Sequence, residues 1–177
     1  MGRVLLLFNV ILLCGRIAEA KRDYSIELEY ITPVITNIPF IKSLNFSLTN
    51  KKAANMDVIF QYKLNKIPVR ASAYLLTKGK RRITLFESPL DICESLNNTA
   101  PNKFLAVFKD EMLRTSNVPH HCPLLGNFLY SVRNYTVHEE YYPSFLPEAR
   151  WQFDININNN RNVKTGIVTV RGRICRV

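Results

Sequence analysis

The chain has 177 residues and a formal net charge of +10 at neutral pH, and 47% of its residues are hydrophobic. Its first twenty residues follow the plan of a secretory signal peptide, with an apolar run from Val4 to Cys14 and an A-x-A cleavage site at Ala18-Glu19-Ala20. That run is shorter than the roughly 20 residues that cross a bilayer. Residues 21–177 suit one domain of a secreted protein, and the secretory route excludes nucleic acid as the expected partner.

Segments in which apolar and polar residues alternate predict eight short β-strands. They cover 24–31, 44–48, 56–64, 69–77, 83–93, 128–137, 151–158 and 168–174. Within 128–137, Leu129, Tyr135 and Val137 are expected to share one face, with Asn134 on the other. About eight strands at regular spacing predict a mostly β fold, an antiparallel β-sandwich with one short helix over one side or mouth.

A basic turn joins the fourth and fifth predicted strands. Its tip carries Lys78, Lys80, Arg81 and Arg82 around Gly79. These side chains are candidates for contact with anionic head groups or a receptor. The alternative is a solvated turn whose charge serves solubility alone.

Residues 101–115 change to a helical period, with Thr99 as the expected N-cap. Glu111 intrudes on the apolar side of this predicted helix, so the separation of apolar and polar faces is imperfect. The apolar side carries Phe104, Val107, Phe108 and Met112.

Cys93, Cys122 and Cys175 remain after the expected signal peptide, and an oxidising compartment favours one disulfide with one cysteine left over. We expect the pair Cys93–Cys122, whose closed loop stabilises the fold by about 3–4 kcal/mol on a chain-entropy estimate. Cys175 is then free, joins two chains, or competes for one of the other two. The protein is accordingly expected to be a monomer or a Cys175-linked dimer.

Three N-glycosylation sequons occur, at Asn45, Asn97 and Asn134. Three sequons behind a signal peptide predict at least one glycan, and each would mark a solvent-exposed position.

Catalytic patterns are weak in this sequence. His120, Cys122, His138 and Glu139 lack the tight spacing of zinc motifs, and a disulfide at Cys122 would prevent it from binding metal. A Cys122–His121 nucleophile pair is disfavoured because adjacent residues on an extended chain point apart. We therefore expect no metal site, no cofactor and no enzymatic activity.

Aromatic residues gather around the predicted helix and the loops beside it. In most proteins such residues are plain core, but in a sandwich whose sheets splay apart they line an apolar cavity. The sequence does not separate these two alternatives. The residues are Phe104, Phe108, Tyr130, Tyr141, Tyr142, Phe145, Trp151 and Phe153.

The segment from Leu85 to Phe153 resembles an insect family of small secreted proteins of unknown function, which is distantly similar to the ML (MD-2-related lipid-recognition) and ganglioside-activator fold. The resemblance is carried by Asp91-Ile92-Cys93, the helix with Phe104, Phe108 and Met112, His121-Cys122-Pro123, the segments 126–130 and 143–147, and the strand beginning at Trp151. It implies an immunoglobulin-like cup that holds a hydrophobic molecule, with a structural disulfide between Cys93 and Cys122. Some relatives are linked to chemosensation or lipid presentation.

These observations predict a secreted protein that binds a lipid or small hydrophobic molecule without catalysis, with a receptor or an anionic membrane surface as a further candidate partner. The alternative is an extracellular protein-interaction module, a receptor co-factor or surface protein, with a solid core and no ligand. A large apolar cavity favours the first and a filled core with an exposed aromatic patch favours the second. The candidate ligand-lining residues are Phe104, Phe108, Met112, Tyr130, Trp151 and Phe153.

Overall fold

The computed structural model describes residues 23–35, 39–77, 81–98, 103–144, 146–158 and 164–177. The expected signal peptide, residues 1–20, lies outside them. No helix of the described part is both long enough and apolar enough to cross a bilayer.

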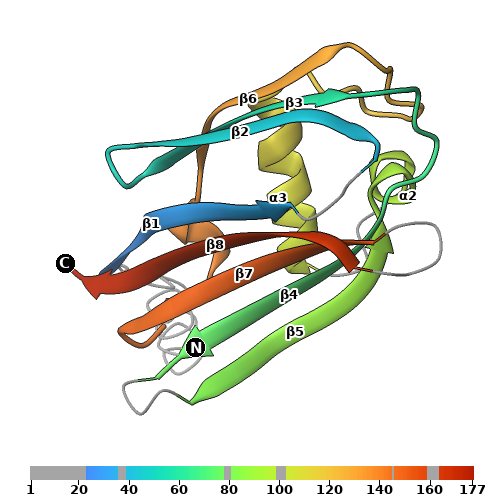
Figure 1. The fold of residues 1–177 in the computed structure, drawn as a ribbon. Coiled ribbons are helices and arrows are strands. Elements are labelled where there is room, and N and C mark those ends of the chain that lie inside the picture. Colours follow the sequence, from blue (N-terminus) through green and yellow to red (C-terminus); the bar gives the residue numbers. More distant parts are fainter. Residues whose placement is uncertain (1–22, 36–38, 78–80, 99–102, 145, 159–163) are drawn as a thin grey trace, which may run out of the picture.

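Two antiparallel sheets face each other, which confirms the predicted mostly β sandwich (Figure 1). The five-stranded sheet has the order β1 (Tyr24–Ile35), β8 (Lys164–Arg176), β7 (Ala149–Asn158), β4 (Pro68–Leu76) and β5 (Arg82–Asp91). The three-stranded sheet has the order β2 (Ile41–Thr49), β3 (Ala53–Phe60) and β6 (Leu129–Thr136). β1 and β5 are therefore the edge strands of the larger sheet.

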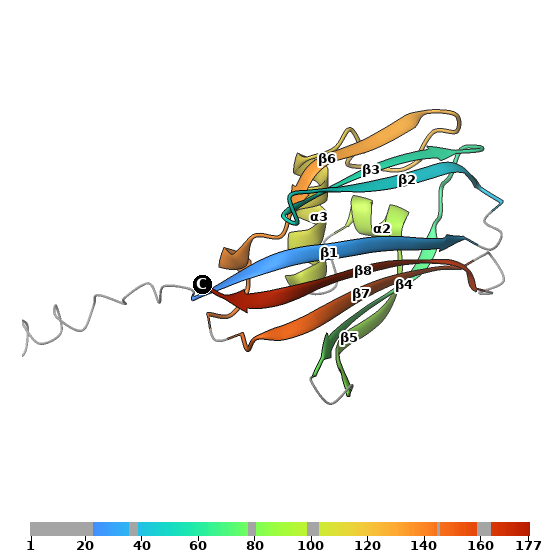
Figure 2. The same ribbon diagram turned by 60° about the vertical axis from the view of Figure 1, so that its left-hand side comes forward.

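The helix α3 (Lys103–Arg114) stretches from one sheet toward the other, transverse to the strands, in both views (Figures 1 and 2). Its bounds agree with the predicted helix at 101–115, and the predicted N-cap Thr99 lies outside the described residues. A single-turn 3-10 helix, η1 (Glu139–Tyr141), follows β6. The sandwich thus has its two sheets connected by a helix rather than packed directly throughout.

A second short α-helix, α2 (Ile92–Asn97), was not predicted, because the fifth strand was expected to run to Cys93. The strand ends at Asp91, whose side chain caps the helix. One carboxylate oxygen accepts a hydrogen bond from the Glu94 N–H at 3.1 Å, and the other accepts one from the Ile67 N–H at 3.0 Å. An aspartate at this position satisfies backbone donors that a continuing strand would leave unpaired.

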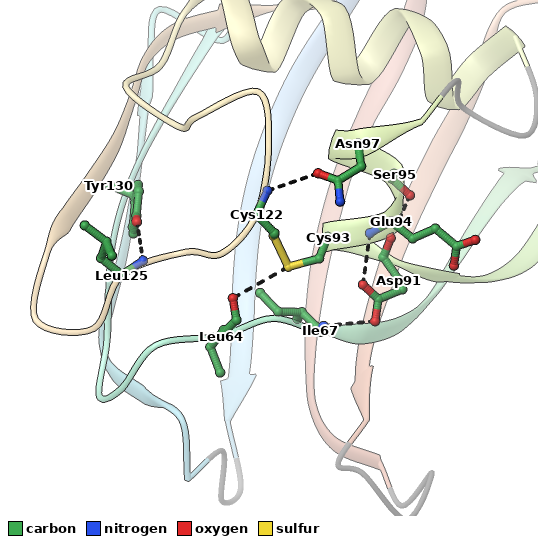
Figure 3. Close-up of a disulfide and its surroundings, with 10 residues drawn as sticks. All are labelled: Leu64, Ile67, Asp91, Cys93, Glu94, Ser95, Asn97, Cys122, Leu125 and Tyr130. Atoms are coloured by element: carbon green, nitrogen blue, oxygen red, sulfur yellow. Dashed lines mark hydrogen bonds between the residues drawn. A yellow bond between two sulfur atoms is a disulfide. The ribbon is translucent and has the colours of Figure 1, made fainter.

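The predicted disulfide between Cys93 and Cys122 is confirmed, with 5.4 Å between the two Cα atoms (Figure 3). It joins α2 to the segment before β6. The Cys122 N–H donates to the Asn97 side chain at 3.1 Å, and backbone hydrogen bonds of 2.8 and 2.9 Å join Leu64 to Leu124. We call this region the disulfide end. Its buried apolar side chains include Leu64, Ile67, Val69, Cys93, Leu96, Leu124 and Tyr130.

A bulge in β6 changes which residues face the interior. Asn134 has a positive φ of 54°, and the register with β3 shifts between the pairs Met56–Val132 and Ala54–Tyr135. Asparagine tolerates this left-handed conformation better than most residues. Leu129 was expected to share a face with Tyr135, but the bulge lies between them and Leu129 is 48% exposed.

Candidate functional site

A cavity of about 570 Å³ lies between the two sheets and α3. We call it the central cavity. Its volume is within the range of about 300–1,000 Å³ that is typical of small-molecule sites. Side chains from both sheets and from the helix line it, and most of them are apolar, including Leu28, Leu75, Phe86, Trp151, Phe153 and Val168 from the larger sheet, Leu44, Phe46, Met56, Val58, Val132 and Tyr135 from the smaller one, and Leu105, Phe108 and Met112 from α3.

Two separate clusters of buried side chains account for the packed core. The larger cluster contains the disulfide end and extends along both sheets. The smaller one consists of Tyr24, Ile26 and Ile174, with Trp151 and Leu146 among the half-buried side chains packed against it. The core is therefore divided rather than continuous, and the central cavity has walls from both clusters.

Four aromatic rings that belong to neither cluster form a connected row across the sandwich. The ring centroids of Phe86 and Phe153 are 6.1 Å apart, those of Phe153 and Phe108 are 5.7 Å apart, and those of Phe108 and Tyr135 are 5.4 Å apart. The row runs from β5 and β7 through α3 to β6. We call it the aromatic row. All four rings line the central cavity and are half-buried, so they present apolar faces that protein atoms do not fully cover.

Two of the described residues that line the cavity are exposed at the surface. Leu85 in the edge strand β5 is 48% exposed, and Pro143, which follows η1, is exposed as well. Leu85 lies at a register shift between β4 and β5, because Ala73 pairs with Phe86 whereas Tyr74 pairs with Thr84. Such a bulge is typical of a sheet edge next to a site.

The structure brings most of the predicted lining residues together. Phe108, Met112, Trp151 and Phe153 all line the central cavity. Tyr130 does not: it is 3% exposed, belongs to the packed cluster, and accepts a hydrogen bond from the Leu125 N–H at 2.6 Å (Figure 3). The side chain of Phe104 lies outside the described residues.

Sequence reasoning missed two members of the aromatic row, Phe86 and Tyr135. Phe86 is in an edge strand whose bulge disturbs the alternation, so its face was not evident. Tyr135 was expected to share a face with Val137, opposite the sequon Asn134, and that signal was sufficient to include it among the lining candidates.

Glu111 is a buried carboxylate on α3, 6% exposed, and ties the helix to the chain after β6. Arg114 donates two hydrogen bonds of 2.8 Å to it, and His138 Nε2 lies 3.3 Å from Oε1. Burial raises the pKa of Glu111, but the hydrogen bonds from Arg114 and His138 outweigh burial, so the pKa lies below its usual value of 4.5. The charge that intrudes on the apolar side of the helix is therefore compensated.

Glu139 in η1 connects the smaller cluster to the β2–β3 turn. Its carboxylate accepts a hydrogen bond from the Ile26 N–H at 3.0 Å and lies 3.5 Å from the Lys52 ammonium. The Tyr24 hydroxyl donates to the Pro143 carbonyl at 2.8 Å. Burial raises the pKa of Glu139, but the Ile26 N–H and Lys52 together lower it by more than burial raises it, so the net shift of the pKa is downward. These contacts fix the segment on which Pro143 lies.

The predicted basic tip is only partly described, because Lys78 and Lys80 lie outside the described residues. Arg81 is exposed. Arg82 forms an ion pair of 2.9 Å with Asp154, and its guanidinium lies 3.3 Å from the centre of the Tyr74 ring. Arg82 is thus held on the outer face of the larger sheet by a carboxylate that is 5% exposed.

Other predicted positions have simple environments. Asn45, Asn97 and Asn134 are exposed, as a glycan requires. Cys175 carries a free thiol in β8, opposite Ser25 of β1. His138 contacts Glu111 and Glu140, and the described residues contain no group of three or more histidine, cysteine, aspartate or glutamate side chains arranged to hold a metal ion.

One segment of the chain matches a known protein family. Residues 66–153 match a family described as "Protein of unknown function (DUF1091)". The matched segment runs from just before β4 into β7, and includes the disulfide, α3 and all four rings of the aromatic row. No curated protein matches the chain. Part of the central cavity, including the walls from β1, β2 and β8, comes from outside the matched segment.

Proposed function

We propose that this protein binds one molecule of a lipid or another small hydrophobic compound in the central cavity, without catalysis. The observation that carries the proposal is the cavity itself, about 570 Å³ between two sheets and lined mostly by apolar side chains. Removing apolar ligand surface from water contributes about 25 cal/mol per Å². The half-buried rings of the aromatic row supply the surface against which such a ligand would pack.

The wider setting of the proposal is a secreted carrier or presenting protein of the ML lipid-recognition type, chemosensory in some relatives. The signal-like start of the sequence, three exposed asparagines in sequons and a disulfide support an extracellular location. A sandwich with a cavity between its sheets supports the likeness to the ML cup. A receptor or an anionic membrane surface remains the proposed destination of the carrier.

A different observation favours the alternative function, a protein-interaction module. The turn before β6 and the start of that strand present three exposed apolar side chains, with exposed fractions of 52% for Leu125, 43% for Phe128 and 48% for Leu129. Neighbouring exposed apolar side chains mark many protein-binding surfaces. This surface lies at the disulfide end and not at Leu85 or Pro143, so the two functions can be tested separately.

The experiment is native mass spectrometry of protein secreted from eukaryotic cells, followed by organic extraction. The cavity is filled by Ala73→Phe, because Ala73 lines it in the middle of β4. The matched control Thr84→Phe adds the same ring at an exposed position of the neighbouring strand. We expect a co-purifying apolar compound with the wild-type protein and with Thr84→Phe, and its loss from Ala73→Phe at an unchanged melting temperature.

A wild-type mass equal to that of the glycoprotein alone, with no uptake of N-phenyl-1-naphthylamine, would contradict the carrier function. Binding of a partner protein that is lost on Phe128→Ser would then support the interaction module.

A further inference from the structure

Tyr135 lines the central cavity and carries a hydroxyl group at the end of its ring. The bulge at Asn134 directs Tyr135 inward: Arg133 and Asn134 are both exposed, whereas Val132 and Tyr135 both line the cavity. The Asn134 N–H donates to the Asn55 side chain at 2.9 Å, which holds the bulge in place. The Tyr135 ring is fixed by Phe108, with 5.4 Å between the ring centroids.

Among the described residues, the Tyr135 hydroxyl has no hydrogen-bond partner within the protein. It is also not fully covered by protein atoms, because Trp151 Nε1 is the one fully covered side-chain nitrogen or oxygen without a partner in that part of the chain. A buried tyrosine hydroxyl usually finds a partner, so an unpaired one that lines a cavity is available to a ligand.

The polar groups of two other lining residues, Asn55 and Gln152, are already engaged elsewhere. The Asn55 amide bonds to Ser47, Thr49 and the backbone of Asn134. The Gln152 amide bonds to Asp154 and Arg171. The Tyr74 ring lies under the Arg82 guanidinium on the outer face of the sheet. The Tyr135 hydroxyl, by contrast, is a donor without a competing bond in the described part of the chain.

The charges around Tyr135 favour an uncharged ligand group. Burial, together with the nearby Tyr142 and Glu111, raises the pKa of Tyr135, so the phenol stays protonated at neutral pH. The Glu111 carboxylate is itself ionised at neutral pH, because its pKa is lowered. Its partners Arg114 and His138 face it. None of the described residues that line the cavity is a lysine, arginine or histidine that could pair with an anionic head group.

We propose that the central cavity selects a single hydrocarbon-bodied molecule that carries one uncharged oxygen, a hydroxyl or a carbonyl, which bonds to the Tyr135 hydroxyl. This inference rests on the proposed function and names the ligand class for the same cavity. A ligand with a carboxylate or phosphate would place its charge beside Glu111 in an apolar surrounding, which is costly without a cation. A pure hydrocarbon would leave the Tyr135 hydroxyl unpaired.

The test is displacement of N-phenyl-1-naphthylamine by three probes of equal chain length: 1-dodecanol, dodecane and dodecanoate. Each is titrated into the wild-type protein, Tyr135→Phe and the control Tyr62→Phe, which removes a hydroxyl from a side chain that is 51% exposed and outside the cavity lining. Comparing each probe between variants cancels the different hydration of the probes. A melting curve for each variant shows that its fold is intact.

We expect Tyr135→Phe to weaken the binding of 1-dodecanol about fivefold, which is the effect of one ordinary neutral hydrogen bond, and to leave the binding of dodecane unchanged. Tyr62→Phe should change neither. Equal effects of Tyr135→Phe on 1-dodecanol and dodecane, or tightest binding of dodecanoate, would overturn the inference while leaving the cavity function intact. Failure of all three probes and of N-phenyl-1-naphthylamine itself to bind would instead overturn the proposed function on which the inference rests.

Discussion

The disulfide end and the central cavity are built from the same kinds of apolar residues, yet they differ in how completely those residues are covered. At the disulfide end, Cys93, Leu96 and Leu124 are 2–4% exposed, and the chain segments are joined by a covalent bond and paired backbone groups. Around the cavity, the four rings of the aromatic row are half-buried, and Leu85 is 48% exposed. The interior of the first region is filled, whereas the interior of the second has apolar surface available.

This difference indicates a division of roles within one sandwich. Close packing and cross-linking at one end supply stability, so that the sheets can remain apart around the cavity. The contacts of α3 follow the same division. Leu105 and Phe108 line the cavity, whereas Leu113 packs against the large cluster. Met112 does both.

The largest effect should come from breaking the cross-link. Replacing Cys93 and Cys122 together by alanine is expected to lower the free energy of unfolding by about 3–4 kcal/mol, because the unfolded chain regains the entropy of a loop that spans 29 positions. Urea denaturation measures this change. Cys175→Ala is the matched control and should leave the unfolding free energy unchanged, since its thiol is unpaired in the chain. If the two changes had equal effects on the unfolding free energy, the disulfide would not have the stabilising role assigned to it.

A matched pair of leucines compares the packing of the two regions directly. Leu124→Ala, at a side chain that is 4% exposed and outside the cavity lining, should cost about 3 kcal/mol of unfolding free energy. Leu75→Ala, at a half-buried lining position, should cost about 1 kcal/mol, because its side chain lacks protein neighbours on the cavity side. Urea denaturation of the two variants without ligand provides the comparison. A larger cost at Leu75 would show that the cavity region is packed as closely as the disulfide end.

The sequence predicts the closed end better than the cavity. Three cysteines remain after the expected signal peptide and allow only three possible pairs, so the pair Cys93–Cys122 around a helix could be selected from the sequence. The strict alternation of β7 also identified Trp151 and Phe153 as inward-facing. The helix α2 was missed because six residues are too few to show a helical period, and its apolar residues continued the strand pattern.

The cavity could not be derived from the pattern, because a filled core and a lined cavity require the same apolar residues at the same spacing. What separates them is the distance between sheets, which depends on α3 and on bulges. The bulge at Asn134 has no signal in the alternation around it, although asparagine is a residue that accepts the positive φ. The sequence showed that Glu111 is out of place on its helix face. It did not show that His138 is the partner of Glu111, because the two residues are 27 positions apart.

The bulge provides a smaller and more local test. Asn134→Gly and Asn134→Val both remove the sequon, so they form a matched pair without the glycan. We expect Asn134→Val to be less stable than Asn134→Gly by about 1–2 kcal/mol, because a β-branched residue is strained at a φ of 54°. Urea denaturation gives the difference. Equal stability of the two variants would mean that β6 can lose its bulge, and with it the inward position of Tyr135.

The smallest effect concerns pH and the contact between α3 and the chain after β6. Because the pKa of Glu111 in the folded protein is below its usual value of 4.5, its ionised form contributes stability above that pH, and the contribution is lost as the pH falls through the folded value. The melting temperature should therefore fall less steeply between pH 6 and pH 3 for Glu111→Gln than for the wild-type protein. Some dependence of the melting temperature on pH should remain in Glu111→Gln, because other carboxylates, such as Glu139, also have lowered pKa values. Identical slopes would show that Glu111 is not ionised in a paired state.

The affinity for a series of 1-alkanols of increasing length tests the central claim most directly, that the interior holds one apolar ligand in a bounded cavity. Each buried methylene should contribute about 0.8 kcal/mol, so the affinity should rise about fourfold per carbon and then level off when the chain fills the cavity. Ala73→Phe should move the levelling point to shorter chains. Absence of binding, or a steady rise with no levelling point in both proteins, would contradict a bounded ligand cavity between the sheets.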